Sequence, residues 1–213
     1  ARWRPPARRT TKFRYIKSVE PIPSVPMRCL TVDNPSGLFL VSKAHIPTHN
    51  TQLGLALALF AHRNSLLLRR TAKDTKALSE SLRSIGSQFG CRWKWVGNGG
   101  EMVTPDGRVI EVGGCQHEKD KDAYQGHPDD LKYFDELPQF TESMYLFIGG
   151  WNRPRDPVRY PTQRNRIVGG GNPPMTAEGE WVRKRWNPWI EGNDPSGRLR
   201  WYVRFDGEAD EVE

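Results

Sequence analysis

Two short apolar runs, each followed by a helical pattern, constrain the fold of this chain more than any other feature. The runs cover residues 37–42 and 64–70, and each has the length of a buried strand. Residues 51–63 are apolar almost all round, as a buried crossover helix would be, and residues 71–89 have a helical pattern with polar faces. This order of strand and helix predicts an α/β fold with parallel strands and right-handed crossovers.

The middle of the chain interrupts this order. Residues 92–113 alternate between apolar and polar around a Pro-Asp-Gly turn, which predicts a hairpin inserted beside the main sheet. Residues 115–130 are polar and are expected to form a loop. Residues 141–151 then form a predicted helix, with Thr141 as its N-cap. The insertion therefore separates two halves of one α/β unit.

Two more apolar runs, 131–135 and 164–168, complete the expected sheet. We expect them to lie in one mainly parallel sheet with residues 37–42 and 64–70. A phosphate-binding fold requires residues 37–42 and 131–135 to share that sheet, because the two strands must bring their ends to one site. No apolar run approaches the roughly 18 residues of a membrane span, and no secretory signal pattern is found, so a soluble intracellular protein is expected.

The net charge of +7 resides in one short segment. Residues 1–17 contain seven basic residues and no acidic one, and the other 25 basic residues balance the 25 acidic ones. The basic residues of this segment are Arg2, Arg4, Arg8, Arg9, Lys12, Arg14 and Lys17. Such an arm can follow the phosphates of DNA, or it can be a disordered solubilising tail. We therefore divide the chain into an arm (1–17), a folded domain (18–205) and an acidic tail (206–213).

A pair of carboxylates, Asp135 and Glu136, follows the apolar run at 131–135. Nucleotide hydrolases need two carboxylates at such a position, one for Mg²⁺ and one to polarise the attacking water. The strand at 164–168 runs into Gly170, Gly171 and Asn172, where glycines permit a close backbone approach and the amide could sense a γ-phosphate. Solvated turn carboxylates and a simple Gly/Pro loop are the alternatives for each motif taken alone.

Several short motifs in this order resemble the large terminase family of tailed phages. They are Cys115-Gln116-His117-Glu118, Tyr124-Gln125-Gly126, Phe134-Asp135-Glu136, Gly171-Asn172-Pro173-Pro174 and Thr176-Ala177-Glu178-Gly179-Glu180-Trp181-Val182. The resemblance covers roughly residues 37–205 and implies an additional-strand P-loop ATPase that drives double-stranded DNA into a procapsid. It implies ATP and Mg²⁺ as cofactors, and the portal protein, the small terminase subunit and a homo-oligomeric ring as partners, in the host cytoplasm.

The resemblance also assigns roles to single residues. Asp135 matches the Mg²⁺-binding aspartate, Glu136 the catalytic glutamate, and the Gly170–Asn172 stretch the motif that couples hydrolysis to movement. Arg69 and Arg70 match arginines near the nucleotide. A shared Mg²⁺–phosphate site requires the Asp135 carboxylate and the Thr51 hydroxyl to lie within about 8 Å of each other.

The expected phosphate loop departs from its pattern. It should read G-x-x-x-x-G-K-[ST], but residues 44–51 read Ala-His-Ile-Pro-Thr-His-Asn-Thr. Thr51 survives as a Mg²⁺ ligand, whereas His49 replaces a glycine and Asn50 replaces the lysine. Lys43, beside Ala44, could restore the missing charge from the front of the loop. Weak nucleotide binding is expected, and the alternative function is a non-hydrolysing or truncated remnant that binds only DNA or a partner.

Overall fold

A computed structural model of the chain describes one large α/β unit and two small hairpins. The backbone is described for residues 39–41, 46–48, 50–172, 174, 176–190, 201–205 and 208–212, and the side chains for residues 51–172, 174 and 176–186. In these parts no helix is long and apolar enough to cross a membrane.

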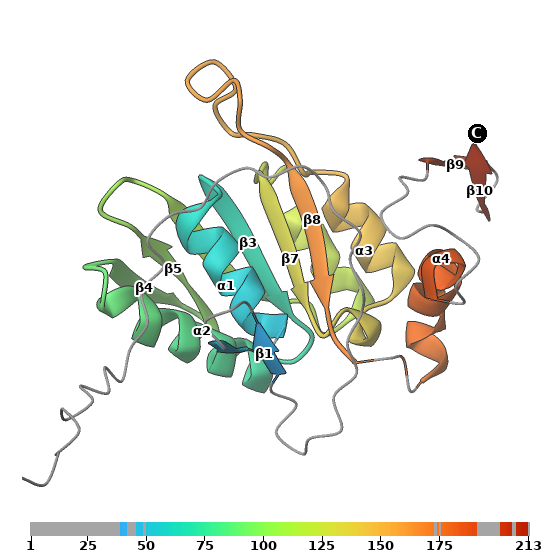
Figure 1. Cartoon of the computed structure of the whole chain (residues 1–213), viewed down its shortest axis with the longest axis horizontal. Coiled ribbons are helices and arrows are strands. Elements are labelled where there is room, and N and C mark those ends of the chain that lie inside the picture. Colours follow the sequence, from blue (N-terminus) through green and yellow to red (C-terminus); the bar gives the residue numbers. More distant parts are fainter. Residues whose placement is uncertain are drawn as a thin grey trace, which may run out of the picture.

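The centre of the unit is a six-stranded mixed sheet (Figure 1). Its order is β4-β5-β6-β3-β7-β8. The strands are β3 (Asn64–Arg69), β4 (Arg92–Val96), β5 (Gly99–Val103), β6 (Val109–Gly114), β7 (Leu131–Asp135) and β8 (Arg166–Gly170). β6, β3, β7 and β8 are mutually parallel, and β4 and β5 are added antiparallel at one edge. The predicted mainly parallel sheet with flanking helices is confirmed.

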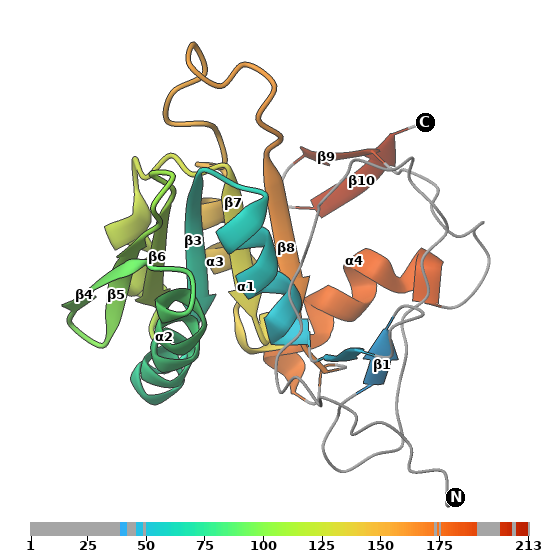
Figure 2. The same cartoon turned by 60° about the vertical axis from the view of Figure 1, so that its left-hand side comes forward.

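Helices cover both faces of this sheet (Figure 2). α1 (Asn50–Phe60) and α2 (Ala72–Ser87) pack on one face through a core that includes Leu55, Leu67 and Leu82. The other face carries α3 (Glu142–Gly149), the 3₁₀ helices η1 (Glu118–Tyr124), η2 (Leu137–Gln139) and η3 (Ala177–Gly179), and α4 (Glu180–Ile190). Side chains of a strand alternate between faces, so Leu66 and Leu68 enter this second core.

Local sequence signals explain where the helices begin. The Thr71 hydroxyl accepts a hydrogen bond from the Asp74 N–H at 3.2 Å and so caps α2. Thr141 caps α3 in the same way, through the Met144 N–H at 3.2 Å, as its sequence predicted. These caps fix the first residue of each helix.

The expectation for residues 37–42 is wrong. β1 (Phe39–Val41) pairs antiparallel with β2 (Ile46–Thr48) in a separate two-stranded sheet. Pairing with β2 satisfies the backbone of this run locally, and so β1 does not join β7. Residues 39–41 and 131–135 therefore lie in separate sheets, and the requirement stated above for a phosphate-binding fold is not met by this run. The phosphate-loop prediction for the residues between this run and Thr51 therefore loses its supporting strand.

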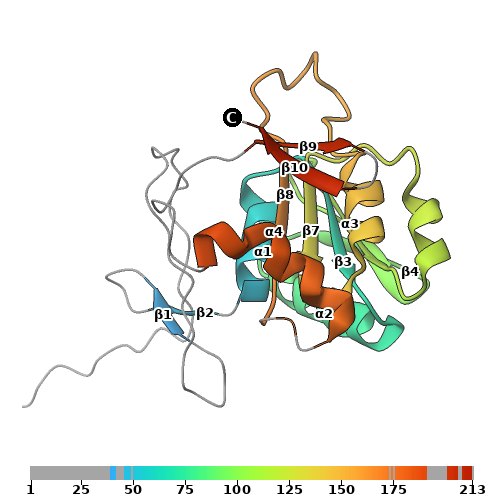
Figure 3. The ribbon, with the colours of Figure 1, turned by 90° about the vertical axis from the view of Figure 1, so that its right-hand side faces the viewer.

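Two further expectations need correction. Residues 92–113 do form antiparallel hairpins, β4 with β5 and β5 with β6, but these lie within the main sheet and not beside it, because β6 pairs parallel with β3. Residues 115–130 are not all loop, because residues 118–124 form η1, where Tyr124 is buried. Near the carboxyl end, β9 (Trp201–Phe205) and β10 (Glu208–Val212) form an antiparallel hairpin (Figure 3), so the expected acidic tail contains a strand.

Candidate functional site

The carboxyl end of β7 meets the amino end of α1. The Thr51 hydroxyl donates a hydrogen bond to Asp135 Oδ1 at 2.9 Å, across 84 residues of sequence. This confirms the expected proximity within about 8 Å. The carboxyl ends of parallel strands are where α/β proteins bind ligands, so the contact lies at the favoured edge of the sheet.

Asp135 is fully buried and has three neighbours of different kinds. Arg69 Nε lies 2.6 Å from Oδ2, an ion pair rather than an aligned hydrogen bond. The Tyr133 hydroxyl donates to Oδ1 at 3.2 Å, alongside Thr51. Burial raises the pKa of Tyr133, and the negative charge of Asp135 raises it further, so the phenol remains a proton donor to the carboxylate. The carboxylate is thus held in one orientation.

Glu136 takes a backbone conformation that is rare for residues other than glycine. Its φ and ψ are 58° and 54°, in the left-handed region, at the start of η2. This turn brings its side chain to Asn172, whose N–H donates to Oε2 at 3.5 Å. A Cβ on Gly171 would lie 3.2 Å from the Glu136 Cα and 2.7 Å from Pro138 Cδ, so only glycine allows this approach. Strain at a residue next to a buried carboxylate is typical of functional sites.

The parallel pairing of β7 and β8 brings the two motifs together. Asp135 is in register with Gly170, so Gly171 and Asn172 continue beside Glu136. Sequence alone placed these residues at the ends of two strands. The tertiary structure adds that the strands are neighbours.

The two arginines at the end of β3, Arg69 and Arg70, have different contacts. Arg69 contacts Asp135, as expected of a residue near the site. Arg70 instead donates to the Cys115 carbonyl at 2.9 Å and contacts Met144 Sδ at 2.7 Å. Successive residues of an extended strand point to opposite faces, which explains the difference.

Several expected site residues cannot be located in the same way. Asn50 is described only as the first residue of α1. The residues that lie outside the described parts are Lys43, Ala44 and His49 of the loop, and Arg2, Arg4, Arg8, Arg9, Lys12, Arg14 and Lys17 of the arm. Their roles stay predictions.

Sequence reasoning missed a buried polar network before β7. Asp130 accepts from the backbone N–H groups of Arg63 and Asn64 and lies 2.8 Å from His62 Nδ1. The other ring nitrogen of His62 faces Arg166 Nη1 at 2.9 Å. Because a guanidinium only donates, this nitrogen accepts, and the proton lies on Nδ1 toward Asp130.

Lys132, the polar residue inside the apolar strand run, belongs to an adjoining pair. Its Nζ lies 2.5 Å from Asp129 Oδ2 and donates to the His127 carbonyl at 2.8 Å. Arg155 Nη2 binds the other oxygen of Asp129 at 2.8 Å. The consecutive aspartates before the run were the available signal, because buried acids need such partners. This network positions β7 and therefore Asp135.

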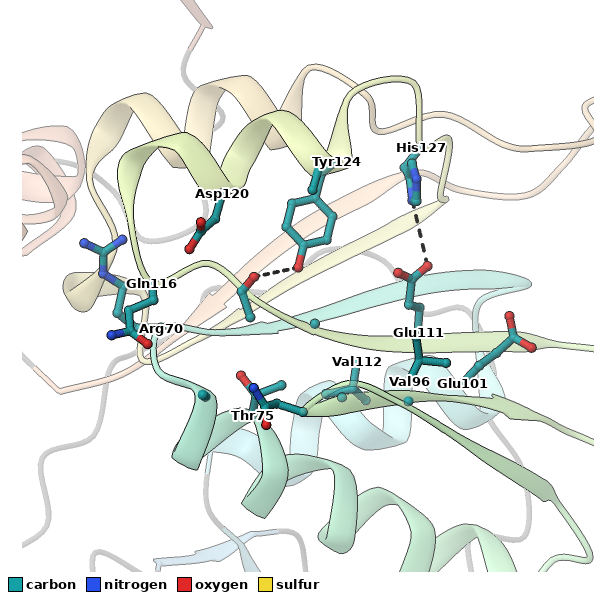
Figure 4. Close-up of a pocket in the computed structure, with 17 residues that line it drawn as sticks. Arg70, Thr75, Val96, Glu101, Glu111, Val112, Gln116, Asp120, Tyr124 and His127 are labelled. Atoms are coloured by element: carbon teal, nitrogen blue, oxygen red, sulfur yellow. Dashed lines mark hydrogen bonds and ion pairs between the residues drawn. The ribbon is translucent and has the colours of Figure 1, made fainter.

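A separate cavity of about 510 Å³ lies between β5, β6 and η1 (Figure 4). Arg70, Asp120 and Tyr124 line it, together with the pair His127–Glu111, whose side chains are 3.9 Å apart. Burial raises the pKa of Glu111. None of Thr51, Asp135 and Glu136 lines this cavity, so it is not part of the site at the end of β7.

These features define an α/β protein with a carboxylate–hydroxyl pair at the carboxyl edge of its sheet. Mg²⁺ prefers hard oxygen ligands and usually keeps several waters. The Thr51 hydroxyl and the Asp135 carboxylate are two such ligands, and their oxygens lie 2.9 Å apart. Arg69 supplies the positive charge next to Asp135 in this structure. The residues present therefore fit a magnesium ion bound to Asp135 and Thr51, with Glu136 beside it.

Comparisons with known proteins point in two directions. No protein-family profile matches the chain. The structure is similar to two solved structures of a large terminase from a thermophilic bacteriophage, one of them in complex with ADP. The TM-scores are 0.42 and 0.41, the sequence identities are 15% and 16%, and the similarity covers 57% of this chain and 30% and 29% of those chains.

The curated relatives are of another kind. A stretch of 42 residues is 52% identical to the replicative DNA helicase DnaB of Mycobacterium intracellulare, and 40 residues are 50% identical to that of Mycobacterium leprae (strain TN). The matches cover 20% and 19% of this chain and 7% of each relative. The chain thus spans less than a tenth of the curated relatives it matches.

Proposed function

We propose that the α/β unit is the ATPase part of a viral terminase-like motor that moves double-stranded DNA into a procapsid. One observation carries the proposal. The Thr51 hydroxyl donates a hydrogen bond to Asp135 Oδ1 at 2.9 Å, at the carboxyl edge of the parallel strands. The motifs around Glu136 and Asn172, which resemble those of large terminases, support the same function.

The roles follow from the chemistry that phosphoryl transfer needs. Thr51 and Asp135 would hold Mg²⁺, which neutralises the charge on the β- and γ-phosphates when bound. Glu136 would take a proton from the attacking water. Asn172, hydrogen-bonded through its N–H to Glu136, would link the state of that carboxylate to the chain after β8. Arg69 would have to share or release Asp135 when the metal binds.

The partners and location are part of the same proposal. A motor of this kind would act on duplex DNA with a portal protein and a small terminase subunit, as a ring, in the host cytoplasm. The short match to DnaB gives no second candidate function, because it covers 7% of those helicases. A remnant that binds only DNA or a partner is the alternative, and the following titration separates it from an ATPase.

The test is a titration of a fluorescent ATP analogue with and without Mg²⁺. We expect Mg²⁺-dependent but weak binding, because the lost lysine and glycine turn each remove contacts of about 1.5–3 kcal/mol, which together weaken the affinity by roughly 100-fold or more. Asp135→Asn should abolish the Mg²⁺ dependence. Glu136→Gln should retain binding and lose hydrolysis, whereas Asp106→Asn, at an exposed turn, should change neither.

Binding that is absent at millimolar nucleotide, or that Asp135→Asn leaves unchanged, would favour the remnant. Micromolar affinity in the unaltered chain would show instead that residues 43–50 form a competent phosphate loop. His49→Gly with Asn50→Lys restores the turn and the charge. That double variant should gain affinity by the same factor if residues 43–50 are the phosphate loop, whereas an unchanged affinity would show that two substitutions cannot replace the supporting strand that this segment lacks.

A further inference from the structure

The connections of the sheet show where the strand before α1 belongs. The chain passes from β3 through α2 toward β6, with α2 on the face that α1 also covers. It passes from β7 through α3 to β8 in the opposite direction, with α3 on the other face. Both connections have the same hand, as parallel crossovers in one sheet do.

By the same rule, the strand that leads into α1 must lie on the β8 side of β3. β7 and β8 fill the first two positions there, and α1 packs against both (Figure 1). The remaining position is beyond β8, where the structure describes no strand. Ile167 of β8, the outermost described strand on this side, is 38% exposed, although the faces of parallel sheets are normally covered by helices.

The strands that the structure describes before α1 do not occupy this position. β1 and β2 pair with each other as a hairpin, and β2 ends two residues before α1 begins. The Thr51 hydroxyl nevertheless donates a hydrogen bond to Asp135, which is the position expected of a magnesium ligand. The geometry expected of a magnesium site therefore begins at Thr51. On its amino side, the described strands β1 and β2 do not join the main sheet, and the sequence of residues 44–50 departs from that of a phosphate loop.

The comparison with DnaB adds an independent observation. About 40 residues are half identical to part of two proteins that the chain otherwise hardly covers. The matched length of 40 to 42 residues is shorter than the 50 residues that precede Thr51. A segment shared by two otherwise different proteins behaves as a transferable unit.

The residue at the boundary has a special reactivity. Asn50 directly precedes Thr51, and His49 precedes Asn50. Asparagine can cleave the peptide bond on its own carboxyl side, because its amide nitrogen can reach its own backbone carbonyl. A neighbouring histidine can move the proton that this step requires near neutral pH. The same residues that are wrong for a phosphate loop are suited to peptide-bond cleavage.

We propose that the Asn50–Thr51 bond is a self-cleaving splice junction. Residues up to Asn50 end a segment that removes itself, and Thr51 is joined to a different peptide that supplies the strand beyond β8 and the phosphate loop. The proposal that Thr51 is joined to another peptide rests on the proposed ATPase function, because that peptide would supply the phosphate loop that an ATPase needs. The cleavage half rests on the junction alone.

The cleavage step balances without any co-reactant. The Asn50 Nδ2 attacks the Asn50 carbonyl carbon, the bond from that carbon to the Thr51 nitrogen breaks, and the proton lost by Nδ2 passes to the Thr51 nitrogen. The products are a segment ending in a succinimide and a chain beginning with a free Thr51 amine. No water is consumed, so the two product masses add up to the mass of the intact chain.

The joining step needs a peptide whose last carboxyl carbon is activated as an ester or thioester. The Thr51 hydroxyl takes this acyl group as an ester and releases the alcohol or thiol. After cleavage the freed Thr51 amine attacks the ester carbon, an amide forms, and the carbon–oxygen bond breaks. The hydroxyl is regenerated, so Thr51 ends as part of a continuous chain with its magnesium ligand intact.

The experiment follows the two sides of the junction in protein made from its own gene. Electrophoresis and intact-mass spectrometry show whether residues 1–50 and 51–213 remain in one polypeptide. We expect the unaltered protein to separate them, with the smaller product one water lighter than hydrolysis would give. In the larger product, a residue other than Asn50 should precede Thr51. Asn50→Ala should abolish separation, and His49→Ala should slow it by about 100-fold.

Asn98→Ala is the matched control, because Asn98 lies in the turn between β4 and β5 and should leave the separation unchanged. Separation that survives Asn50→Ala, or an unaltered protein that keeps both parts in one chain, would overturn the proposal. A larger product with a free Thr51 amine would overturn the joining half alone. ATP plays no part in these measurements, so an inactive ATPase site would leave the cleavage result unaffected.

Discussion

At the scale of single residues, the main electrostatic cost in this fold is the buried negative charge of Asp135. A buried carboxylate is costly unless it is paired, and here Arg69 provides the opposite charge at 2.6 Å. Thr51 and Tyr133 supply hydrogen bonds from a helix and from the same strand. The residue proposed to hold the metal is therefore oriented before any ligand binds.

A double-mutant cycle on this pair tests that account. Asp135→Asn and Arg69→Met should each lower the free energy of unfolding by about 1–3 kcal/mol, less than the full cost of a buried pair because Arg69 is partly exposed. The double variant should lose less than the sum, with a coupling of about 1–3 kcal/mol in urea denaturation. The exposed pair Arg183–Glu180, also at close range, should show a coupling below about 1 kcal/mol. Additive losses at Asp135 and Arg69 would contradict the pairing.

At the scale of elements, α1 is held against β7 by a glycine. A Cβ on Gly54 would collide with the ring of Tyr133, which is fully buried. The helix can approach the strand only because this position has no side chain. The same approach brings Thr51, one turn earlier, to Asp135.

Gly54→Ala should therefore destabilise the protein, although this change in a helix normally stabilises it by about 1 kcal/mol. We expect a loss of about 1–3 kcal/mol from overpacking in thermal or urea denaturation. At Gly86 of α2, a Cβ would collide with the flexible end of the Met102 side chain and would lie 3.3 Å from Cys91 Cβ. Gly86→Ala should cost less. A stabilising effect of Gly54→Ala would show that α1 does not approach β7 this closely.

The connection between η1 and α3 predicts a dependence on pH. Glu118 binds Lys121 at 2.5 Å and accepts from the Thr141 hydroxyl at 2.8 Å. The hydrogen bond from Lys121, then those from Ser143 and Thr141, lower the pKa of Glu118 from 4.5 to about 2. A lowered pKa means that the charged form stabilises the fold above pH 4.5 and that this contribution disappears as the pH falls toward 2.

Glu118→Gln should consequently be less stable than the unaltered protein near neutral pH, by less than about 1 kcal/mol because the side chain is exposed. The difference should shrink on acidification. Denaturation curves at neutral pH, at the ordinary pKa of 4.5 and below it measure this. A difference that grows as the pH falls would mean that the protonated form makes the contact.

For the molecule as a whole, the distribution of charge predicts where DNA binds. Residues 1–17 hold the entire net charge. The basic residues of α4 are partly neutralised, because Arg183 pairs with Glu180 and Arg185 with Glu142, each at 2.9 Å. Any duplex affinity of the chain should therefore reside mainly in the arm.

Deleting residues 1–17 should remove most non-specific duplex binding in fluorescence anisotropy. The logarithmic salt slope of the complete chain should be up to about 6 if seven cations engage phosphates, and it should flatten after the deletion. Substituting Arg183 and Lys184 by glutamine is the comparison for a local patch on the folded unit. An unchanged slope in the deleted protein would place the DNA on that unit.

Local sequence signals were sufficient for much of the fold and part of the site. Strand length, helix periodicity and the Thr141 cap depend on neighbouring residues, so α1, α2, α3, β3, β7 and β8 were predicted close to their observed bounds. The spacing of Asp135 and Glu136 after an apolar run indicated the site for the same reason. Only chemistry within a few residues was needed.

The tertiary structure decided which strands are neighbours, and with them everything that depends on long-range pairing. Residues 39–41 read as a buried strand, but their partner is residues 46–48 and not β7, because pairing depends on a second segment that periodicity cannot identify. Lys132 is a charged residue inside the apolar run of β7, and its buried ion pair with Asp129 explains how the strand accommodates it. The strand position beyond β8, which none of the described strands fills, follows only from the order and hand of the connections. Burial and register are properties of pairs of distant segments, and so only the folded chain could decide them.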